Sequence, residues 1–221
     1  NKNYFFKILF FFILFFQFSF VLSDEFQFEA ATIETSSKGD IINGFGGVEI
    51  NYKKDLTLTG EVFQYNKQDT LLSVEKNVLV KDKFNKNSIK SKKITFNKTL
   101  NIIYIPDKAV IEVDGGYSIE SSNITYDKNL NLIFSNNKTL VTDLYKNKYY
   151  MNTFSYSVID QILIADNVKI TDTENNIYEI KNIRYNLKTN EIIGKDISLI
   201  FNSEIQKSNQ NEPRLKGNAI F

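Results

Sequence analysis

The sequence repeats two short patterns about every 30 residues. The first is a large apolar residue, a spacer and an aromatic ring, which recurs as Val62-Phe63-Gln64-Tyr65, Ile94-Thr95-Phe96, Ile124-Thr125-Tyr126, Phe154-Ser155-Tyr156 and Ile183-Arg184-Tyr185. Its rings are separated by 31, 30, 30 and 29 residues. The second is an apolar stretch that ends in Asp82, Asp114, Asp143 or Asp172, at spacings of 32, 29 and 29 residues. Two markers that keep one period predict a stacked repeat.

Each unit of the repeat is predicted to be two strands joined by a turn. Apolar and polar residues alternate over short spans such as Leu56 to Val62, and turn residues separate these spans. The alternation changes parity between Ile89 and Ile94, which predicts a bulge or a bend. Because a two-stranded unit cannot bury its own apolar face, stacked copies are expected to form two facing sheets. The predicted fold is all-β, an elongated antiparallel jellyroll of about a dozen strands or more.

The absent residue types limit the chemistry of the chain. There is no Cys and no His, which excludes thiol nucleophiles, imidazole acid–base groups and thiolate or imidazole metal sites within this chain. The 27 basic and 26 acidic residues are balanced, so no nucleic-acid partner is expected. No enzyme activity, cofactor or metal is predicted. The recurring Asp residues lack clustered partners for calcium, so capping of turns is the favoured role.

The first 23 residues differ from the rest. Lys2 and Lys7 precede an apolar run that ends in Val21-Leu22-Ser23, which is typical of a signal peptide; a retained membrane anchor is the alternative. Residues 24–206 are predicted to form the jellyroll domain. Residues 207–221 read as a polar loop and the start of a further repeat, so the natural chain is expected to continue, into a barrel domain by the resemblance described next.

Residues from about Glu29 to Phe201 resemble the OstA-type family of lipopolysaccharide-transport proteins. The shared motif is an apolar residue, a small residue, and an apolar-x-aromatic triplet, followed by a Val-x-Val/Ile-x-Asp stretch. It is best kept in Ile89-Lys90-Ser91-Lys92-Lys93-Ile94-Thr95-Phe96 and Ile119-Glu120-Ser121-Ser122-Asn123-Ile124-Thr125-Tyr126. Within the family, the tail from Asn211 to Asn218 is most like the N-terminal periplasmic domain of the outer-membrane assembly protein. Unlike many such domains, this one has no cysteine.

The resemblance implies a periplasmic, non-enzymatic conduit in which lipopolysaccharide acyl chains lie in an apolar trough between the sheets. It also implies an outer-membrane barrel with its plug lipoprotein, and a bridge protein that adds a strand to the N-terminal edge. The residues expected to line the trough are Leu58, Val62, Tyr65, Val78, Val80, Ile94, Phe96, Ile124, Tyr126, Phe154, Tyr156, Val168, Ile170, Ile183 and Tyr185. Val110 and Val141 are expected on the same wall as Val78, Val80, Val168 and Ile170, which faces the wall of aromatic rings. The residues expected at the partner edge are Phe26, Phe28, Ala31 and Ile33.

Other interpretations stay open from the sequence. The chain could be the soluble bridge or the anchored component of the same pathway. It could also be a surface-displayed carbohydrate-binding or adhesive β-solenoid. The same apolar residues could pack as a closed sandwich core without any lipid.

Overall fold

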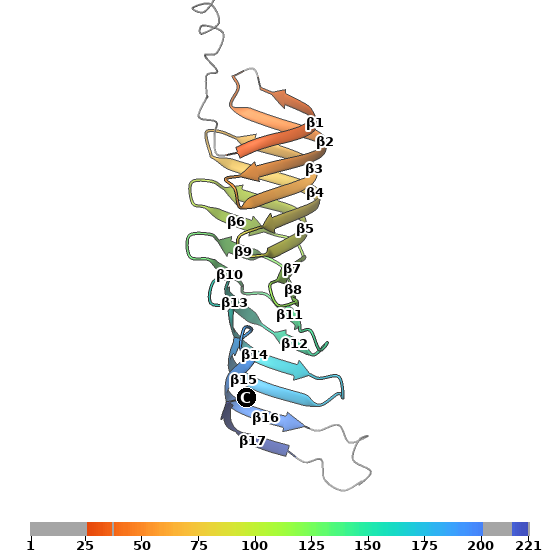
Figure 1. The fold of residues 1–221 in the computed structure, drawn as a ribbon, viewed down its shortest axis with the longest axis vertical. Coiled ribbons are helices and arrows are strands. Elements are labelled where there is room, and N and C mark those ends of the chain that lie inside the picture. Colours follow the sequence, from red (N-terminus) through yellow and green to blue (C-terminus); the bar gives the residue numbers. More distant parts are fainter. Residues whose placement is uncertain (1–25, 37, 201–213, 221) are drawn as a thin grey trace, which may run out of the picture.

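The computed structural model describes residues 26–36, 38–200 and 214–220, and all of its regular elements are strands (Figure 1). The leader at 1–23 and the polar loop at 207–213 lie outside the described residues. The strands are β1 (Phe26–Thr35), β2 (Ile41–Tyr52), β3 (Leu56–Asn66), β4 (Leu71–Asp82), β5 (Asn87–Asn97), β6 (Ile102–Ile105), β7 (Ala109–Val113), β8 (Tyr117–Ser121), β9 (Ile124–Asp127), β10 (Leu132–Ser135), β11 (Thr139–Thr142), β12 (Lys148–Met151), β13 (Thr153–Ser157), β14 (Ile162–Thr171), β15 (Ile177–Asn186), β16 (Glu191–Ile200) and β17 (Arg214–Ile220).

The long strands bend in the middle, so that each one belongs to both layers. In β2 to β5 the pairing register shifts at the bend, for example between Glu75 and Val78 where β4 pairs with β5. Lys76 and Asn77 both have positive φ there, which turns the strand sharply. This bend is the one that the parity change between Ile89 and Ile94 predicts, and the prediction is confirmed.

In the middle of the stack the bend becomes a break. The C-terminal part of β5 pairs with β6 through Thr95–Asn97, while its N-terminal part pairs with β7 through Ser88–Lys90. Pro106 lies between β6 and β7 and has no N–H to donate to a ladder. Between β8 and β9 the break falls at Asn123, whose φ is 49°. Similar breaks separate β10 from β11 and β12 from β13.

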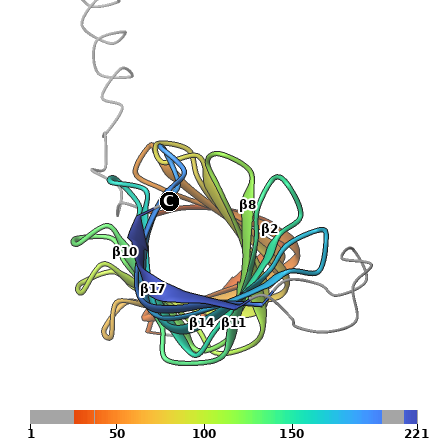
Figure 2. The ribbon, with the colours of Figure 1, turned by 90° about the horizontal axis from the view of Figure 1, so that it is seen from below.

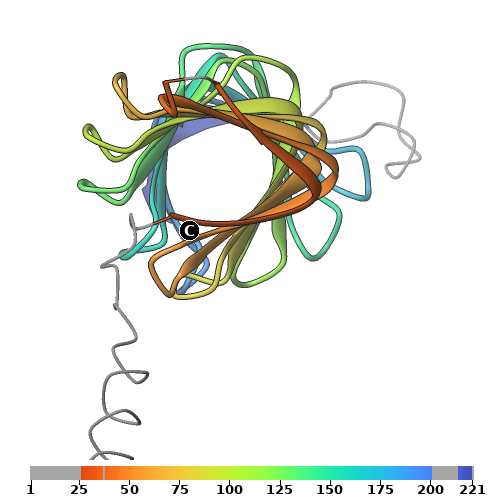
Figure 3. The same cartoon turned by 90° about the horizontal axis from the view of Figure 1, so that it is seen from above.

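The half-strands form two arms that end in two series of turns. Arm A ends in the turns 53–55, 83–86, 114–116, 143–147 and 172–176, and arm B ends in the turns 67–70, 98–101, 128–131, 158–161 and 187–190. Successive turns of arm B are joined by backbone hydrogen bonds, such as Lys98 N–H to the Thr70 carbonyl at 2.9 Å and Leu187 N–H to the Gln161 carbonyl at 2.9 Å. Seen along the long axis, the strands wrap into a ring (Figures 2 and 3). We call the line along which the ends of the two arms meet the mouth.

The five repeated rings lie one above another on arm B, facing the interior. Their exposed fractions are 2% for Tyr65, 0% for Phe96, 1% for Tyr126, 1% for Tyr156 and 4% for Tyr185. Every pairing between the described strands is antiparallel, from β1–β2 to β16–β17. The predicted all-β antiparallel jellyroll is therefore confirmed.

Two predicted interior positions are wrong. Val62 is only half-buried, because the register shift between Thr59 and Val62 moves it off the inward-facing set and leaves Phe63 facing inward instead. The Phe63 ring lies over Gly44, where a Cβ would come within 2.1 Å of that ring. Val110 faces outward, while its neighbour Ile111 is fully buried. The break at Pro106 explains the second error, because it resets the alternation before β7.

Strand β1 forms one edge of the stack. It pairs with β2 from Phe26–Tyr52 to Thr35–Ile42, and within the described residues it has no second strand partner. At the other end, β17 pairs only with β16 among the described strands. Such open edges present unpaired backbone N–H and C=O groups to any strand that can reach them.

Candidate functional site

The interior of the roll is the strongest candidate for a functional site. It is a continuous apolar core that contains all the predicted trough residues except Val62 and Val110: Leu58, Tyr65, Val78, Val80, Ile94, Phe96, Ile124, Tyr126, Phe154, Tyr156, Val168, Ile170, Ile183 and Tyr185. Val141 belongs to the same core. The side chains fill this space themselves, since Leu58, Ile94 and Phe96 are completely buried. The interior is thus a packed core.

A cluster of rings closes the N-terminal end of the core, and the sequence analysis missed it. The Phe26 ring lies 4.9 Å from Tyr52, 5.2 Å from Tyr65 and 5.6 Å from Phe96, measured between ring centroids. Phe28 stacks on Phe63 at 4.7 Å. The alternation of Phe26 and Phe28 along the chain was the available signal, because it places both rings on one face of β1.

The predicted partner edge therefore has two sides with different roles. Phe26 is buried and Phe28 is half-buried, so these two side chains belong to the core of this chain. Ala31 and Ile33 are exposed, Ile33 by 47%. Among the described strands only β2 pairs with β1, so the other backbone edge of β1 is open, whichever way its side chains point.

A charged bridge crosses the mouth between arm B and arm A. The Tyr126 hydroxyl donates to Oδ2 of Asp82 at 2.7 Å, and Nζ of Lys128 lies 3.0 Å from the same oxygen. Lys128 also reaches Oδ2 of Asp55 at 3.3 Å. The side chains of Asp82 and Lys128 are 2% and 9% exposed. We call this group the first mouth bridge: Asp55, Asp82, Asn85, Tyr126 and Lys128.

The environment of Asp82 favours its charged form. Burial alone raises the pKa of its carboxyl group, but hydrogen bonds from Tyr126, Asn85 and Lys128 outweigh burial and lower the pKa below its ordinary value. For Tyr126, burial and the Asp82 carboxylate both raise the pKa of the phenol. At neutral pH the bridge is therefore an ionised carboxylate held by a neutral phenol and an ammonium group.

A second bridge, made of tyrosines, crosses the mouth further along the stack. The hydroxyls of Tyr117 on arm A and Tyr185 on arm B lie 2.9 Å apart, and Tyr117 donates to Oδ1 of Asn190 at 2.6 Å. The Tyr149 ring stacks on Tyr185 at 5.7 Å, and its hydroxyl donates to Asp143 at 2.9 Å. The two bridges together join the arms where the sequence predicts an open trough.

These contacts predict unusual behaviour in alkaline solution. Burial raises the pKa of Tyr156 to about 12, and burial also raises the pKa of Tyr117, Tyr126, Tyr149 and Tyr185. Stability from these groups is complete below the ordinary tyrosine pKa of about 10 and is lost as pH rises through the raised values. We expect their phenolate absorbance to appear together with the loss of β circular dichroism, well above pH 10.

The control is the same titration in urea, where every tyrosine of the unfolded chain should ionise near the ordinary value. If Tyr117, Tyr126, Tyr149 and Tyr185 ionise near that value while the β spectrum stays intact, these tyrosines are not buried in the two mouth bridges.

Three of the four recurring Asp residues cap turns of arm A, as predicted. Oδ1 of Asp82, Asp143 and Asp172 accepts the backbone N–H of Asn85, Asn147 and Asn176, respectively, at 2.8–3.0 Å. Asp114 differs, since it forms an ion pair with Lys86 at 3.6 Å on the surface. Within the described ranges no group of three or more potential metal-ligating side chains occurs.

Comparison with known proteins finds similarity among solved structures. No protein-family model matches the chain, and no curated protein matches it. Among solved structures, the chain is similar to LptH of Pseudomonas aeruginosa, described as the LptA homologous periplasmic component of the conserved lipopolysaccharide transport device. The match has 14% identity, covers 88% of this chain and 94% of that chain, and has a TM-score of 0.21. Because the superposition is weak, the function of this chain is inferred from its own geometry.

In the part of the chain that the structure describes, no helix has the length and apolar character needed to cross a bilayer.

Proposed function

We propose that this protein is a non-enzymatic conduit for lipopolysaccharide, whose acyl chains occupy the interior of the roll. The observation that carries the proposal is the unbroken apolar core, which runs through the stack from Phe26 on β1 to Tyr185 on β15. Repeating the same inward apolar positions in each unit makes a long uniform wall, which suits a long uniform ligand such as an acyl chain. Burial of each methylene from water is worth about 0.8 kcal/mol.

Lipid entry on this proposal requires the arms to part. The core side chains are packed against one another, so an acyl chain has to displace these contacts and take their place. The mouth is where parting is easiest, since the arms there are joined by side chains and not by backbone ladders. The two mouth bridges are then the contacts that must break or shift when lipid enters.

The open edge of β1 supports docking of a neighbouring protein by strand addition. A ten-residue edge that carries no proline and has no second partner among the described strands fits this mode of binding. We infer that an LptA-like bridge protein adds its strand here. By the sequence resemblance, the chain is the periplasmic domain of an LptD-like assembly protein that delivers lipid to an outer-membrane barrel and its plug lipoprotein.

Two alternatives belong to the same pathway, and one belongs to another class. A soluble LptA-like bridge or an anchored LptC-like component would use the same interior and the same edge. A surface-displayed, sugar-binding β-solenoid is disfavoured, because such solenoids stack parallel strands and the pairings of this chain are antiparallel.

Site-specific photo-crosslinking tests the interior. A photo-reactive residue at Phe96 or Tyr126 is expected to capture lipopolysaccharide, because both side chains point into the core. The matched control is Lys146 in an exposed turn of arm A, where little capture is expected. Equal labelling at Phe96 and Lys146 would contradict the proposed conduit.

A further inference from the structure

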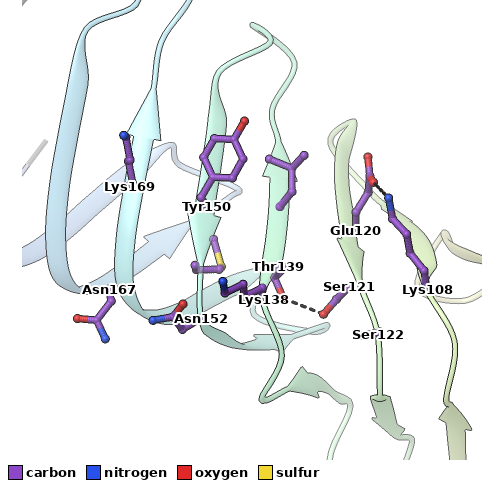
Figure 4. Close-up of a pocket in the computed structure, with 12 residues that line it drawn as sticks. Lys108, Glu120, Ser121, Ser122, Lys138, Thr139, Tyr150, Asn152, Asn167 and Lys169 are labelled. Atoms are coloured by element: carbon purple, nitrogen blue, oxygen red, sulfur yellow. Dashed lines mark hydrogen bonds and ion pairs between the residues drawn. The ribbon is translucent and has the colours of Figure 1, made fainter.

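A hollow on the outer face lies where the middle strands break (Figure 4). Its volume is about 610 Å³, within the range of roughly 300–1,000 Å³ that small-molecule sites occupy. It is separate from the core, because most of its lining side chains point away from the interior. The residues that line it are Lys108, Glu120, Ser121, Ser122, Lys138, Thr139, Leu140, Tyr150, Met151, Asn152, Asn167 and Lys169.

Strand register builds the floor of the hollow. Glu120 pairs with Leu140, Leu140 with Tyr150, and Tyr150 with Lys169, so these four side chains form a row across β8, β11, β12 and β14. Tyr150 is 44% exposed and lies between Leu140 and Lys169 in this row (Figure 4). The floor is therefore apolar and aromatic at its centre, with charged groups at both ends.

The charges of the hollow favour an anion. Lys108 is neutralised by Glu120 at 2.8 Å. In the described chain Lys138 and Lys169 form no ion pair, although Glu179 is the cross-strand neighbour of Lys169 on β15. Figure 4 shows Lys169 beside Tyr150 and Lys138 below it, near Asn152. The lining thus carries three lysines against one glutamate, whereas the whole 221-residue chain carries a net charge of only +1.

The neutral polar groups of the hollow fall into two sets. The deeper hydroxyls are already paired, because Ser121 and Thr139 lie 2.8 Å apart and Thr139 donates to the Asn137 carbonyl. At the rim, the exposed amides of Asn152 and Asn167 are placed to pair with a ligand's hydroxyl groups.

We propose that this hollow binds a phosphorylated sugar. Lys138 and Lys169 hold the phosphate, the Tyr150 ring packs against the apolar face of the sugar, and the amides of Asn152 and Asn167 meet its hydroxyls. Ammonium–phosphate hydrogen bonds are among the stronger polar contacts in proteins, which makes the two lysines the main source of affinity. The site lies outside the core and does not depend on the proposed function.

Calorimetric titration of the whole protein with glucose 6-phosphate tests the site. We expect saturable binding that weakens as salt rises, and an affinity lowered about tenfold or more in Lys138→Gln/Lys169→Gln. The matched control is Lys54→Gln/Lys188→Gln, which removes two exposed turn lysines and should bind like the original protein. Absence of saturable binding, or an equal loss in both double variants, would overturn the proposal.

Two further ligands define the sugar and its source. Inorganic phosphate should bind more weakly than glucose 6-phosphate, and Tyr150→Ala should remove that difference; equal binding of both ligands to the original protein would overturn assignment of a sugar.

Dodecyl glucoside 6-phosphate, kept below its micelle concentration, separates two sources that both satisfy the proposal. Equal affinity indicates a free sugar phosphate, and tighter binding indicates a lipid headgroup. Because glucose 6-phosphate has no acyl chain, its result is independent of crosslinking at Phe96.

Discussion

Replacing Asp82 with alanine is expected to lower the free energy of unfolding by about 3–5 kcal/mol, the typical effect of removing one partner of a buried ion pair. The variant would leave Lys128 buried without its nearest carboxylate, and it would remove the acceptor of the Tyr126 hydroxyl. Urea unfolding followed by circular dichroism measures the change. The expected loss is a large share of the roughly 5–15 kcal/mol that stabilises an ordinary domain.

Asp114→Ala is the matched control for Asp82→Ala. Asp114 stands at the same place in the sequence repeat, but its side chain is 45% exposed and pairs only with a surface lysine at 3.6 Å. Such exposed pairs contribute about 0–1 kcal/mol. Equal destabilisation by the two substitutions would contradict the first mouth bridge, because Asp114 lacks both the buried Tyr126 and Lys128 contacts and the turn-capping hydrogen bond of Asp82.

The pH dependence gives a second check on Asp82. Its pKa is lower in the folded protein than its ordinary value of 3.8, so it stabilises the fold above about pH 4 and loses that contribution as pH falls through the folded pKa. The stability difference between the original protein and Asp82→Asn should therefore shrink on acidification. A difference that stays constant down to low pH would show that the carboxylate charge has no part in the bridge.

Proline substitution in β1 is expected to prevent docking of the bridge protein at one of two neighbouring positions. Consecutive N–H groups along a strand point to opposite sides. Of Ile33→Pro and Glu34→Pro, one therefore removes an N–H that faces away from β2, and the other removes an N–H that pairs with β2. The first should lower affinity for an LptA-like bridge protein by about tenfold or more, since a lost backbone hydrogen bond costs about 1–3 kcal/mol.

The pair of variants contains its own control. Both positions are exposed, so neither substitution removes a core side chain, and Phe26 stays in place. The variant that loses docking should keep the melting temperature of the original protein, while the other should melt earlier because β1 is loosened from β2. Unchanged affinity in both variants would rule out strand addition at this edge.

The sequence predicts the repeat and its consequences well. The period of about 30 residues predicts the stacked rings at Tyr65, Phe96, Tyr126, Tyr156 and Tyr185, because alternation places the same position of each unit on the same face of the sheet. The parity change between Ile89 and Ile94 predicts the bend. The Asp that ends each second strand predicts capped turns. The stacked rings, the bend and the capped turns all follow from patterns within short segments of the sequence.

The predictions of inward-facing side chains are wrong where a bulge or a strand break changes the alternation. The bulge before Val62 exchanges it for Phe63, and the break at Pro106 turns Val110 outward. The sequence does not show at which residue the strand is bulged or broken. A shift of one residue in that position moves a side chain to the other face of the sheet. Positions near a bend are therefore the least certain members of any interior predicted from periodicity.

The sequence by itself determined the strands, the period and the apolar wall, because these follow from alternation and from like residues meeting across a ladder. Only the tertiary structure decided that the mouth is bridged and that a cationic hollow lies on the outer face. Asp82 and Tyr126 are 44 residues apart, and Lys138 lies just before β11 while Lys169 lies on β14. Their approach depends on the twist of the stack and on the strand breaks, which accumulate over many residues and are not encoded in any short segment.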